Sequence, residues 1–260
     1  MSRSRLKIPD DIAGFVEAEY CDDFNINRYY VTQTQIDIIN DIEKNRITAK
    51  KLQAYKINYV NTTLLYGPTG TGKTTFARFV ANRMDKDFVY LNFSALMDGG
   101  FGNTERNLSK VFRYMTAQDC IFMIDEIDCI ATSRTASTND TLKSITIALM
   151  QELDYCKSHN PKAIIIAATN VVDNLDPALQ SRFSIKKEIP LLTNEEKVGF
   201  ILKYLKDLDV PYDIGQIREY VARNSRVTQR VMEQDIIRAL VSWMDDNQQG
   251  YVTLQAYHNY

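Results

Sequence analysis

Residues 67–74 read Gly67-Pro68-Thr69-Gly70-Thr71-Gly72-Lys73-Thr74. Their spacing, G-x-x-x-x-G-K-[ST], is typical of a loop that binds phosphate groups. The apolar run at 62–66 predicts a buried strand before the loop, and residues 75–81 predict a helix after it. Because the motif functions between a strand and a helix, this context favours a phosphate site over a chance glycine-rich turn.

The residue types in this loop suit a nucleoside triphosphate. Glycines allow the backbone to curl so that its N–H groups point at the phosphates, and the helix N-terminus adds partial positive charge. We expect Lys73 to contact the β- and γ-phosphates and the Thr74 hydroxyl to bind Mg²⁺. The residues expected to contact the nucleotide are Pro68, Thr69, Gly70, Thr71, Gly72, Lys73, Thr74 and Thr75.

The composition allows a folded core and excludes few functions. The chain has 260 residues, of which 45% are hydrophobic, enough for one large domain or two smaller ones. The formal net charge of -2 does not indicate a nucleic-acid-binding protein, although a local basic patch is compatible with it. The four cysteines are widely spaced and predict reduced thiols in a cytoplasmic protein rather than a metal site. The sequence contains no long apolar stretch, so no membrane span is predicted.

Apolar runs that alternate with helical periodicity predict an α/β fold with a parallel sheet. Strands are expected at 62–66, 88–93, 120–124, 163–168 and 185–189, and helices at 104–115 and 141–153. Beyond Pro190, helices are expected at 195–205, 214–223, 228–245 and 253–260. We therefore predict an N-terminal helical segment at 1–60, an α/β nucleotide-binding domain at 61–191 and a small all-helical lid domain at 192–260.

The first sixty residues carry weaker signals. Thr32 and Gln35 have the spacing of a capping box. This spacing predicts a helix at about 33–45, and a second short helix is expected near 48–55. The basic residues at the start of the chain suggest an arm for an acidic partner or nucleic acid, or else a solvated terminus.

A second motif supplies acidic side chains. Four apolar residues at 121–124 place Asp125 at the carboxyl end of a strand, where α/β sheets bind ligands. We expect Asp125 to hold Mg²⁺, through water, beside Thr74. Glu126 is then placed to polarise the attacking water, since water is a poor nucleophile without a base. The alternative is a strand that ends in two solvated acids.

In combination, these motifs resemble the AAA+ ATPases, and more narrowly the AAA branch that remodels proteins. The resemblance covers about residues 55–260 of the chain. It rests on Gly67 to Thr74, Asp125-Glu126-Ile127-Asp128, Ala168-Thr169-Asn170, Leu175-Asp176-Pro177-Ala178-Leu179 and Arg182-Phe183. It implies a P-loop NTPase fold of the AAA+ type, ATP with Mg²⁺ as ligand, and assembly into a homo-oligomeric ring, in this family most often a hexamer.

The resemblance also implies roles for three further residues. Asn170 matches the polar residue that positions the attacking water and senses the γ-phosphate. Arg182 matches the arginine finger, which reaches the nucleotide of a neighbouring subunit. Arg230 matches the second sensor on the helical domain, with Arg226 as a competing candidate. Taken alone, Asn170 also suits a strand-end cap and Arg182 a surface arginine.

The loop at 98–105 follows a strand and precedes a helix, where this family places a substrate-gripping loop. Its aromatic residue, Phe101, lies one position later than the family's. An exposed Phe101 suits gripping an extended chain or stacking on a base, and the alternative is that it folds back into the core. The polar loop at 132–139 resembles a second pore loop or serves as a plain connector.

We predict a Mg²⁺-dependent ATPase ring that remodels or translocates a protein substrate, with or without an adaptor. The alternative is a replication or recombination ATPase, of helicase or clamp-loader type, that acts on nucleic acid. The segment Gln180-Ser181-Arg182-Phe183 favours this alternative, because it keeps one arginine where the protein-remodelling pattern has two. A third class is a slow, nucleotide-controlled binding module.

Overall fold

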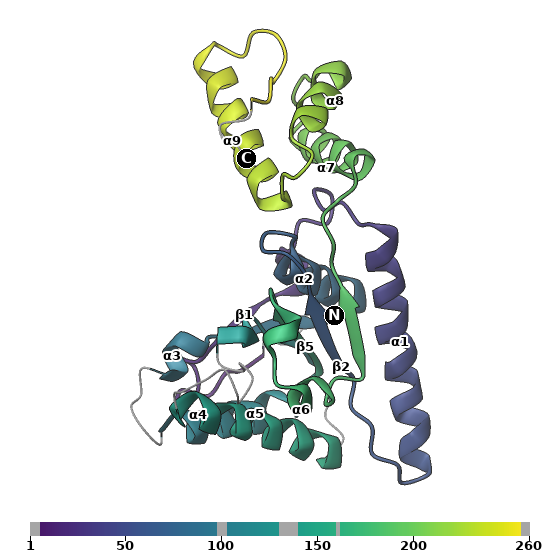
Figure 1. Cartoon of the computed structure of the whole chain (residues 1–260), viewed down its shortest axis with the longest axis vertical. Coiled ribbons are helices and arrows are strands. Elements are labelled where there is room, and N and C mark those ends of the chain that lie inside the picture. Colours follow the sequence, from purple (N-terminus) through teal and green to yellow (C-terminus); the bar gives the residue numbers. More distant parts are fainter. Residues whose placement is uncertain (1–5, 98–102, 130–139, 160–161, 256–260) are drawn as a thin grey trace. The chain divides into compact units, whose positions relative to one another are not determined.

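The computed structural model describes residues 6–97, 103–129, 140–159 and 162–255 (Figure 1). The described residues divide into two compact units. The first contains the described parts of Met1–Phe24, Ile36–Gly67 and Lys73–Glu188. The second contains Asn25–Gln35, Pro68–Gly72 and the described part of Ile189–Tyr260. The middle of the glycine-rich loop therefore belongs to the second unit, whereas the residues at its two ends belong to the first.

The first unit is built on a six-stranded sheet with the strand order β1-β3-β4-β5-β2-β6. The strands are β1 (Val16–Glu19), β2 (Thr62–Tyr66), β3 (Asp87–Leu91), β4 (Cys120–Ile124), β5 (Ile164–Thr169) and β6 (Ile185–Glu188). All neighbouring strands are parallel except β1, which pairs antiparallel with β3 at the edge. The central strands β4 and β5 are buried throughout, as expected for parallel strands covered on both faces.

Helices cover this sheet (Figure 1). α2 (Lys73–Met84) packs against β3 and β4, and α4 (Asn103–Met115) and α5 (Asp140–His159) pack side by side. The other helices are α1 (Gln33–Ala54), most of which belongs to this unit, α3 (Phe93–Met97) and α6 (Pro177–Gln180). Short 3-10 turns lie at Cys21–Asp23, Ile127–Cys129 and Val172–Asn174.

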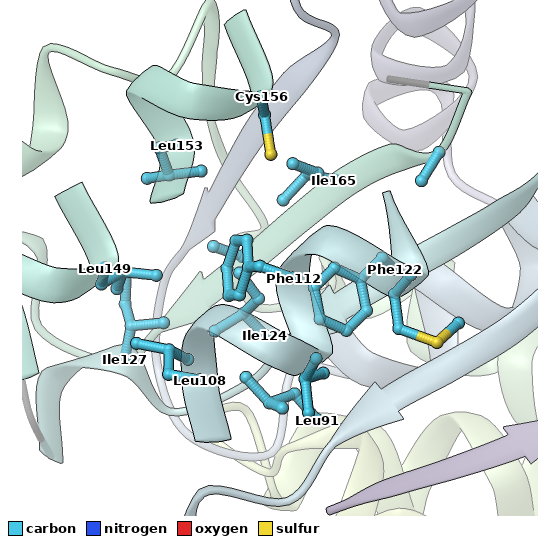
Figure 2. Packing of buried hydrophobic residues seen from close by; sticks show 14 of the residues in the cluster. Leu91, Leu108, Phe112, Phe122, Ile124, Ile127, Leu149, Leu153, Cys156 and Ile165 are labelled. Carbon is cyan, nitrogen blue, oxygen red and sulfur yellow. The ribbon is translucent and has the colours of Figure 1, made fainter. Parts of the chain in front are cut away.

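A hydrophobic core fills the space between the sheet and helices α4 and α5 (Figure 2). Phe112 of α4 meets Phe122 of β4 edge to face, with ring centroids 5.2 Å apart. From α5, the buried side chains of Leu149, Leu153 and Cys156 pack into the same cluster. Truncating Phe112 or Phe122 to alanine is expected to lower the free energy of unfolding by about 3–5 kcal/mol. This closely packed core therefore fixes the positions at which the strands end.

The second unit is helical. It contains α7 (Asn194–Asp207), α8 (Ile214–Arg223) and α9 (Gln229–Asp245). These helices share a separate core, whose fully buried members include Ile201, Leu205, Ile217, Val221, Met232 and Ile236. Among the helices that the structure describes, none is both long and apolar enough to cross a bilayer.

Residues 25–35 run along α7 and belong to the same unit. The Arg28 side chain donates to the Asp207 carboxylate over 2.9 Å. Tyr30 lies against Gly199, where a Cβ atom would come within 2.5 Å of the tyrosine ring. The missing side chain at Gly199 therefore lets this segment lie directly on the helix.

The structure confirms the predicted α/β fold with its parallel strands and C-terminal helices. It corrects the N-terminal part. The helices expected at 33–45 and 48–55 are one helix, α1, because neither proline nor glycine interrupts this stretch. The edge strand β1 had not been predicted, since it is only four residues long and two of them are exposed.

Two smaller expectations were also wrong. The strand expected at 88–93 ends at Leu91, and α3 begins at Phe93. A helix was expected at 253–260, but residues 253–255 lie in no helix, and 256–260 lie outside the described residues. Val252 and Leu254 are buried in the core of the second unit, so this apolar spacing reflects packing of an irregular segment.

Candidate nucleotide site

The candidate site lies where three neighbouring strands end. The glycine-rich loop follows β2, Asp125 follows β4 and Asn170 follows β5. Since β4, β5 and β2 are adjacent and parallel, their carboxyl ends meet at one edge of the sheet. In open α/β sheets this edge is where ligands bind.

The loop backbone requires glycine at three positions. Gly67, Gly70 and Gly72 have φ angles of 142°, 79° and 82°, values that residues with a side chain rarely adopt. The Thr71 hydroxyl donates to the Pro68 carbonyl oxygen over 2.9 Å and closes the turn. The loop residues Pro68 and Thr69 and the helix residue Thr75 are exposed, which leaves them open to a ligand.

Lys73 is buried, with 6% of its surface exposed. Its Nζ atom donates to the Gly67 carbonyl oxygen and to the Asn170 Oδ1 atom, each over 2.8 Å. A buried ammonium group needs such partners to offset its lost hydration. Its place at the start of α2, directly after the glycine-rich loop, suits contact with an anion such as a phosphate.

Thr74 and Asp125 bring two oxygen atoms together. The Thr74 hydroxyl at the start of α2 donates to the Asp125 carboxylate. Hydroxyl and carboxylate oxygens are the ligands that Mg²⁺ prefers, usually together with waters and substrate phosphates. This pair therefore fits a Mg²⁺ ion shared with a phosphate chain.

Glu126 follows directly and has an unusual backbone. Its φ angle of 50° lies in the left-handed region, which costs a residue with a side chain of the order of 1 kcal/mol. Its N–H group donates to the Asp125 Oδ1 atom over 2.9 Å. The side chain is exposed, so its carboxylate can reach water. Strain of this kind at a strand end is common in functional sites.

Asn170 is held from two sides. Its side-chain oxygen accepts from Lys73, and its N–H group donates to the Asp128 carboxylate over 3.3 Å. The four predicted residues thus form two hydrogen-bonded pairs, Lys73 with Asn170 and Thr74 with Asp125, and Lys73 and Thr74 are neighbours in the chain. Glu126 is tied to the same group through the backbone.

Arg182 has different partners. It donates from Nε and Nη2 to the Asp154 carboxylate, over 3.1 and 2.8 Å, and from Nη1 to the Ala178 carbonyl oxygen over 2.6 Å. Its side chain is 27% exposed. Among the residues that the structure describes, Arg182 donates to α5 and α6, and no hydrogen bond between Arg182 and Lys73, Thr74, Asp125 or Asn170 is seen.

The N-terminus of α9 lies on the glycine-rich loop within the second unit. The Arg230 N–H group donates to the Gly70 carbonyl oxygen over 3.2 Å. A Cβ atom on Gly70 would come within 2.8 Å of the Thr228 hydroxyl. Both Arg230 and its competitor Arg226 have exposed side chains. Arg230 meets the loop through its N–H group and its Cβ atom, which lies 3.4 Å from where a Cβ on Gly70 would be.

A cavity of about 250 Å³ lies in the second unit. Two capping boxes line it, Thr32 with Gln35 and Thr193 with Glu196, together with residues 189–192. Thr34 and Gln229 also line it, and the side-chain oxygen of Gln229 lies 2.5 Å from where a Cβ on Gly72 would be. The predicted Thr32–Gln35 box is confirmed, but the sequence did not indicate that it borders a cavity beside the loop.

The structure adds three polar residues that the sequence interpretation missed. Arg78 of α2 donates from Nε and Nη2 to the two Glu19 carboxylate oxygens, over 2.6 and 2.7 Å. Burial raises the pKa of Tyr90, and the negative charges of Asp125 and Glu126 raise it further. A signal was available for Arg78, since it follows Thr74 by four residues and so lies on the same helix face.

The predicted substrate loop lies outside the described residues. This applies to Phe101 and to the polar loop at 132–139. Both remain sequence predictions.

Comparison with known proteins finds similarity over the stretch that contains the candidate site. Residues 63–191 match the family described as ATPase family associated with various cellular activities (AAA). The chain is similar to a putative 26S proteasome regulatory subunit homolog of Methanocaldococcus jannaschii, with 31% identity over 177 residues, or 67% of this chain and 47% of the relative.

Two further relatives show similar identity over shorter stretches. For 26S proteasome regulatory subunit 10B homolog A of Arabidopsis thaliana, identity is 39% over 145 residues, or 54% of this chain and 36% of the relative. For a cell division cycle protein 48 homolog of Archaeoglobus fulgidus, identity is 36% over 154 residues, or 58% of this chain and 21% of the relative. The chain spans less than half the length of each of these three relatives.

Proposed function

Through residues 63–191 the chain belongs to the AAA family of ATP hydrolases, and we propose that it uses Mg²⁺, assembles into a ring and remodels or translocates a protein substrate. The observation that carries the nucleotide chemistry is the presence of two hydrogen-bonded pairs, Lys73 with Asn170 and Thr74 with Asp125, at adjoining strand ends. It combines a buried cation with a hydroxyl–carboxylate pair at the strand ends. These are the groups that a polyphosphate and its metal ion require.

Each residue has a role in this proposal. Lys73 balances charge on the β- and γ-phosphates, and Thr74 and Asp125 hold Mg²⁺, which supplies further neutralisation of the phosphate charge. Glu126 accepts a proton from the attacking water, and Asn170 orients that water. Phosphoryl transfer needs this positioning and charge stabilisation more than covalent help from the protein.

The cavity beside the loop is the proposed site of the nucleotide base. Its volume of about 250 Å³ is smaller than the roughly 300–1,000 Å³ of sites for whole small molecules, and suits one part of a ligand. Gln229 borders both the cavity and Gly72, so a ligand can extend from the cavity to the loop. Within the same unit, the α9 N-terminus meets the loop at Gly70, and its partial positive charge suits an anionic ligand on the loop.

In the proposed ring, a hexamer, Arg182 is the residue that links one subunit to its neighbour's nucleotide. Acting in trans, its guanidinium would balance transition-state charge on a neighbour's nucleotide. In the single chain these donors are directed at Asp154 and Ala178, so assembly would have to exchange those contacts. The relatives named as 26S proteasome regulatory subunits favour a protein substrate.

The test of the substrate class is the ATPase rate with added macromolecules. We expect saturable stimulation by an unfolded protein chain, and none by single- or double-stranded nucleic acid at moderate salt. Stimulation by nucleic acid alone would support the replication or recombination alternative, which the single arginine at 182 favours. A slow rate that no addition changes would support a nucleotide-controlled binding module.

A further inference from the structure

Arg78 lies one helical turn below Thr74, on the same face of α2. The pair Thr74–Asp125 is the proposed metal position. The pKa of Arg78 is raised chiefly by Glu19 and further by the charge of Asp125, so the charges of Arg78 and Asp125 lie within electrostatic range of each other. An arginine in such a place can pair with the metal's carboxylate ligand and compete with the metal for it. What fixes the direction of Arg78 therefore bears on the metal site.

Glu19 fixes it. The two Arg78–Glu19 hydrogen bonds, over 2.6 and 2.7 Å, form a bidentate pair, the most directional contact an arginine makes. The guanidinium carbon also lies 5.0 Å from the centre of the Phe88 ring. Stacking and pairing together leave the guanidinium little freedom to turn.

Glu19 comes from β1, the antiparallel edge strand. In the β1–β3 register, Glu19 lies opposite Phe88 and Glu17 lies opposite Tyr90. The hydrogen bonds to Glu19 are the main reason that the pKa of Arg78 is raised, with a smaller contribution from the charge of Asp125. The charges of Glu19 and Asp125 therefore both act on Arg78, and its two hydrogen bonds described above go to Glu19.

We propose, building on the proposed function of Asp125, that Glu19 is a positioning residue that holds Arg78 away from Asp125 and so leaves this carboxylate free for Mg²⁺. The N-terminal strand then contributes to the metal site without touching the metal. If Glu19 loses its charge, Arg78 turns to Asp125 and competes with the cation. If Arg78 loses its charge too, the competitor is gone and the metal site recovers.

The experiment measures the Mg²⁺ concentration needed for half-maximal binding of a fluorescent ATP analogue. It uses the full chain in a Glu126→Gln background, so that turnover does not interfere. The variants are Glu19→Gln, Arg78→Met and both together. Glu17→Gln is the matched control, because it removes the same charge from the same strand without touching Arg78.

Glu19→Gln should raise the half-maximal Mg²⁺ concentration about three- to fivefold, the upper part of the range expected for a partly exposed charge contact. Binding measured in EDTA should stay unchanged. The double variant should return to within about twofold of the parent, and Glu17→Gln should stay in that range. If Glu19→Gln does not fold, Arg78→Lys tests the same point, since lysine keeps the charge but lacks the bidentate fork, and it should raise the Mg²⁺ requirement.

An unchanged Mg²⁺ requirement in Glu19→Gln would overturn the positioning role of Glu19. So would a double variant as impaired as Glu19→Gln, since that result marks a merely structural strand contact. A parent chain that binds the analogue equally with and without Mg²⁺ would overturn the proposed metal site itself, and the role of Glu19 with it.

Discussion

The Nζ atom of Lys73 lies 2.8 Å from the side-chain oxygen of Asn170, although 97 residues separate them in the chain. One residue begins the helix after the glycine-rich loop, and the other follows a neighbouring strand. The contact joins the residue proposed to bind phosphate to the residue proposed to orient water. An incoming phosphate would take over Lys73 and release Asn170 for that task.

Replacing Lys73 with alanine should weaken ATP binding about 10- to 100-fold, because a charge-assisted contact with phosphate contributes roughly 1.5–3 kcal/mol. Binding of a fluorescent ATP analogue measures this. Lys162→Ala is the control, since this lysine is exposed and lies outside the site. Equal affinity of Lys73→Ala and the parent would exclude Lys73 from the phosphate site.

Mixing two inactive variants tests the proposed trans role of Arg182. Chains with Arg182→Ala keep Lys73, and chains with Lys73→Ala keep Arg182. Random mixing at equal amounts in a closed ring makes about a quarter of the interfaces complete, so about that share of the parent ATPase rate should return. Absence of rescue at every mixing ratio would argue that Arg182 does not act between subunits.

Gly70→Ala should lower the free energy of unfolding by about 1–2 kcal/mol, since the φ angle of 79° disfavours any side chain. The new Cβ would also press on the Thr228 hydroxyl, 2.8 Å away, and so disturb the α9 N-terminus. ATP binding should fall with it. Gly14→Ala is the matched control, because nothing lies within 4 Å of its Cβ position. Equal urea denaturation midpoints for the two variants would contradict this explanation.

Lys197 should make stability depend on alkaline pH. It is 1% exposed and donates to the Ser225 carbonyl oxygen, and burial lowers its pKa below the usual 10.5. In the window between the lowered folded pKa and the unfolded value, the unfolded chain binds the extra proton. The free energy of unfolding should therefore rise with pH in that window. Urea denaturation at several pH values gives the free energy of unfolding of the parent and of Lys197→Met. The parent value minus the variant value should increase as pH approaches 10.5. A difference that does not change with pH would show that Lys197 has an ordinary pKa.

Much of the fold could be predicted because its signals are local. The continuous apolar run at 120–124 forms a central strand, and the helix expected at 214–223 has the predicted bounds. The glycine positions of the loop follow from backbone sterics alone, since Gly70 and Gly72 adopt positive φ angles. The order of the motifs along the chain indicated which strand ends would carry the site.

What escaped prediction depends on contacts between distant residues. β1 is too short and too exposed for its pattern to stand out, and only pairing with β3 makes it a strand. The Arg78–Glu19 pair joins residues 59 positions apart. Gln229 could be placed on a helix from the sequence, but its position beside Gly72 and the cavity depends on how the second unit packs.

The most direct test of the central claim compares Glu126→Gln with the parent chain in two assays on the same preparation. Binding of ATP with Mg²⁺ should be retained within about threefold, because the side chain keeps its size and is exposed. Phosphate release should fall about 10²- to 10⁴-fold, the contribution expected of a general base. A variant that binds ATP and still hydrolyses it at the parent rate would show that Glu126 is not the base. The proposed hydrolytic site would then have to be assigned again.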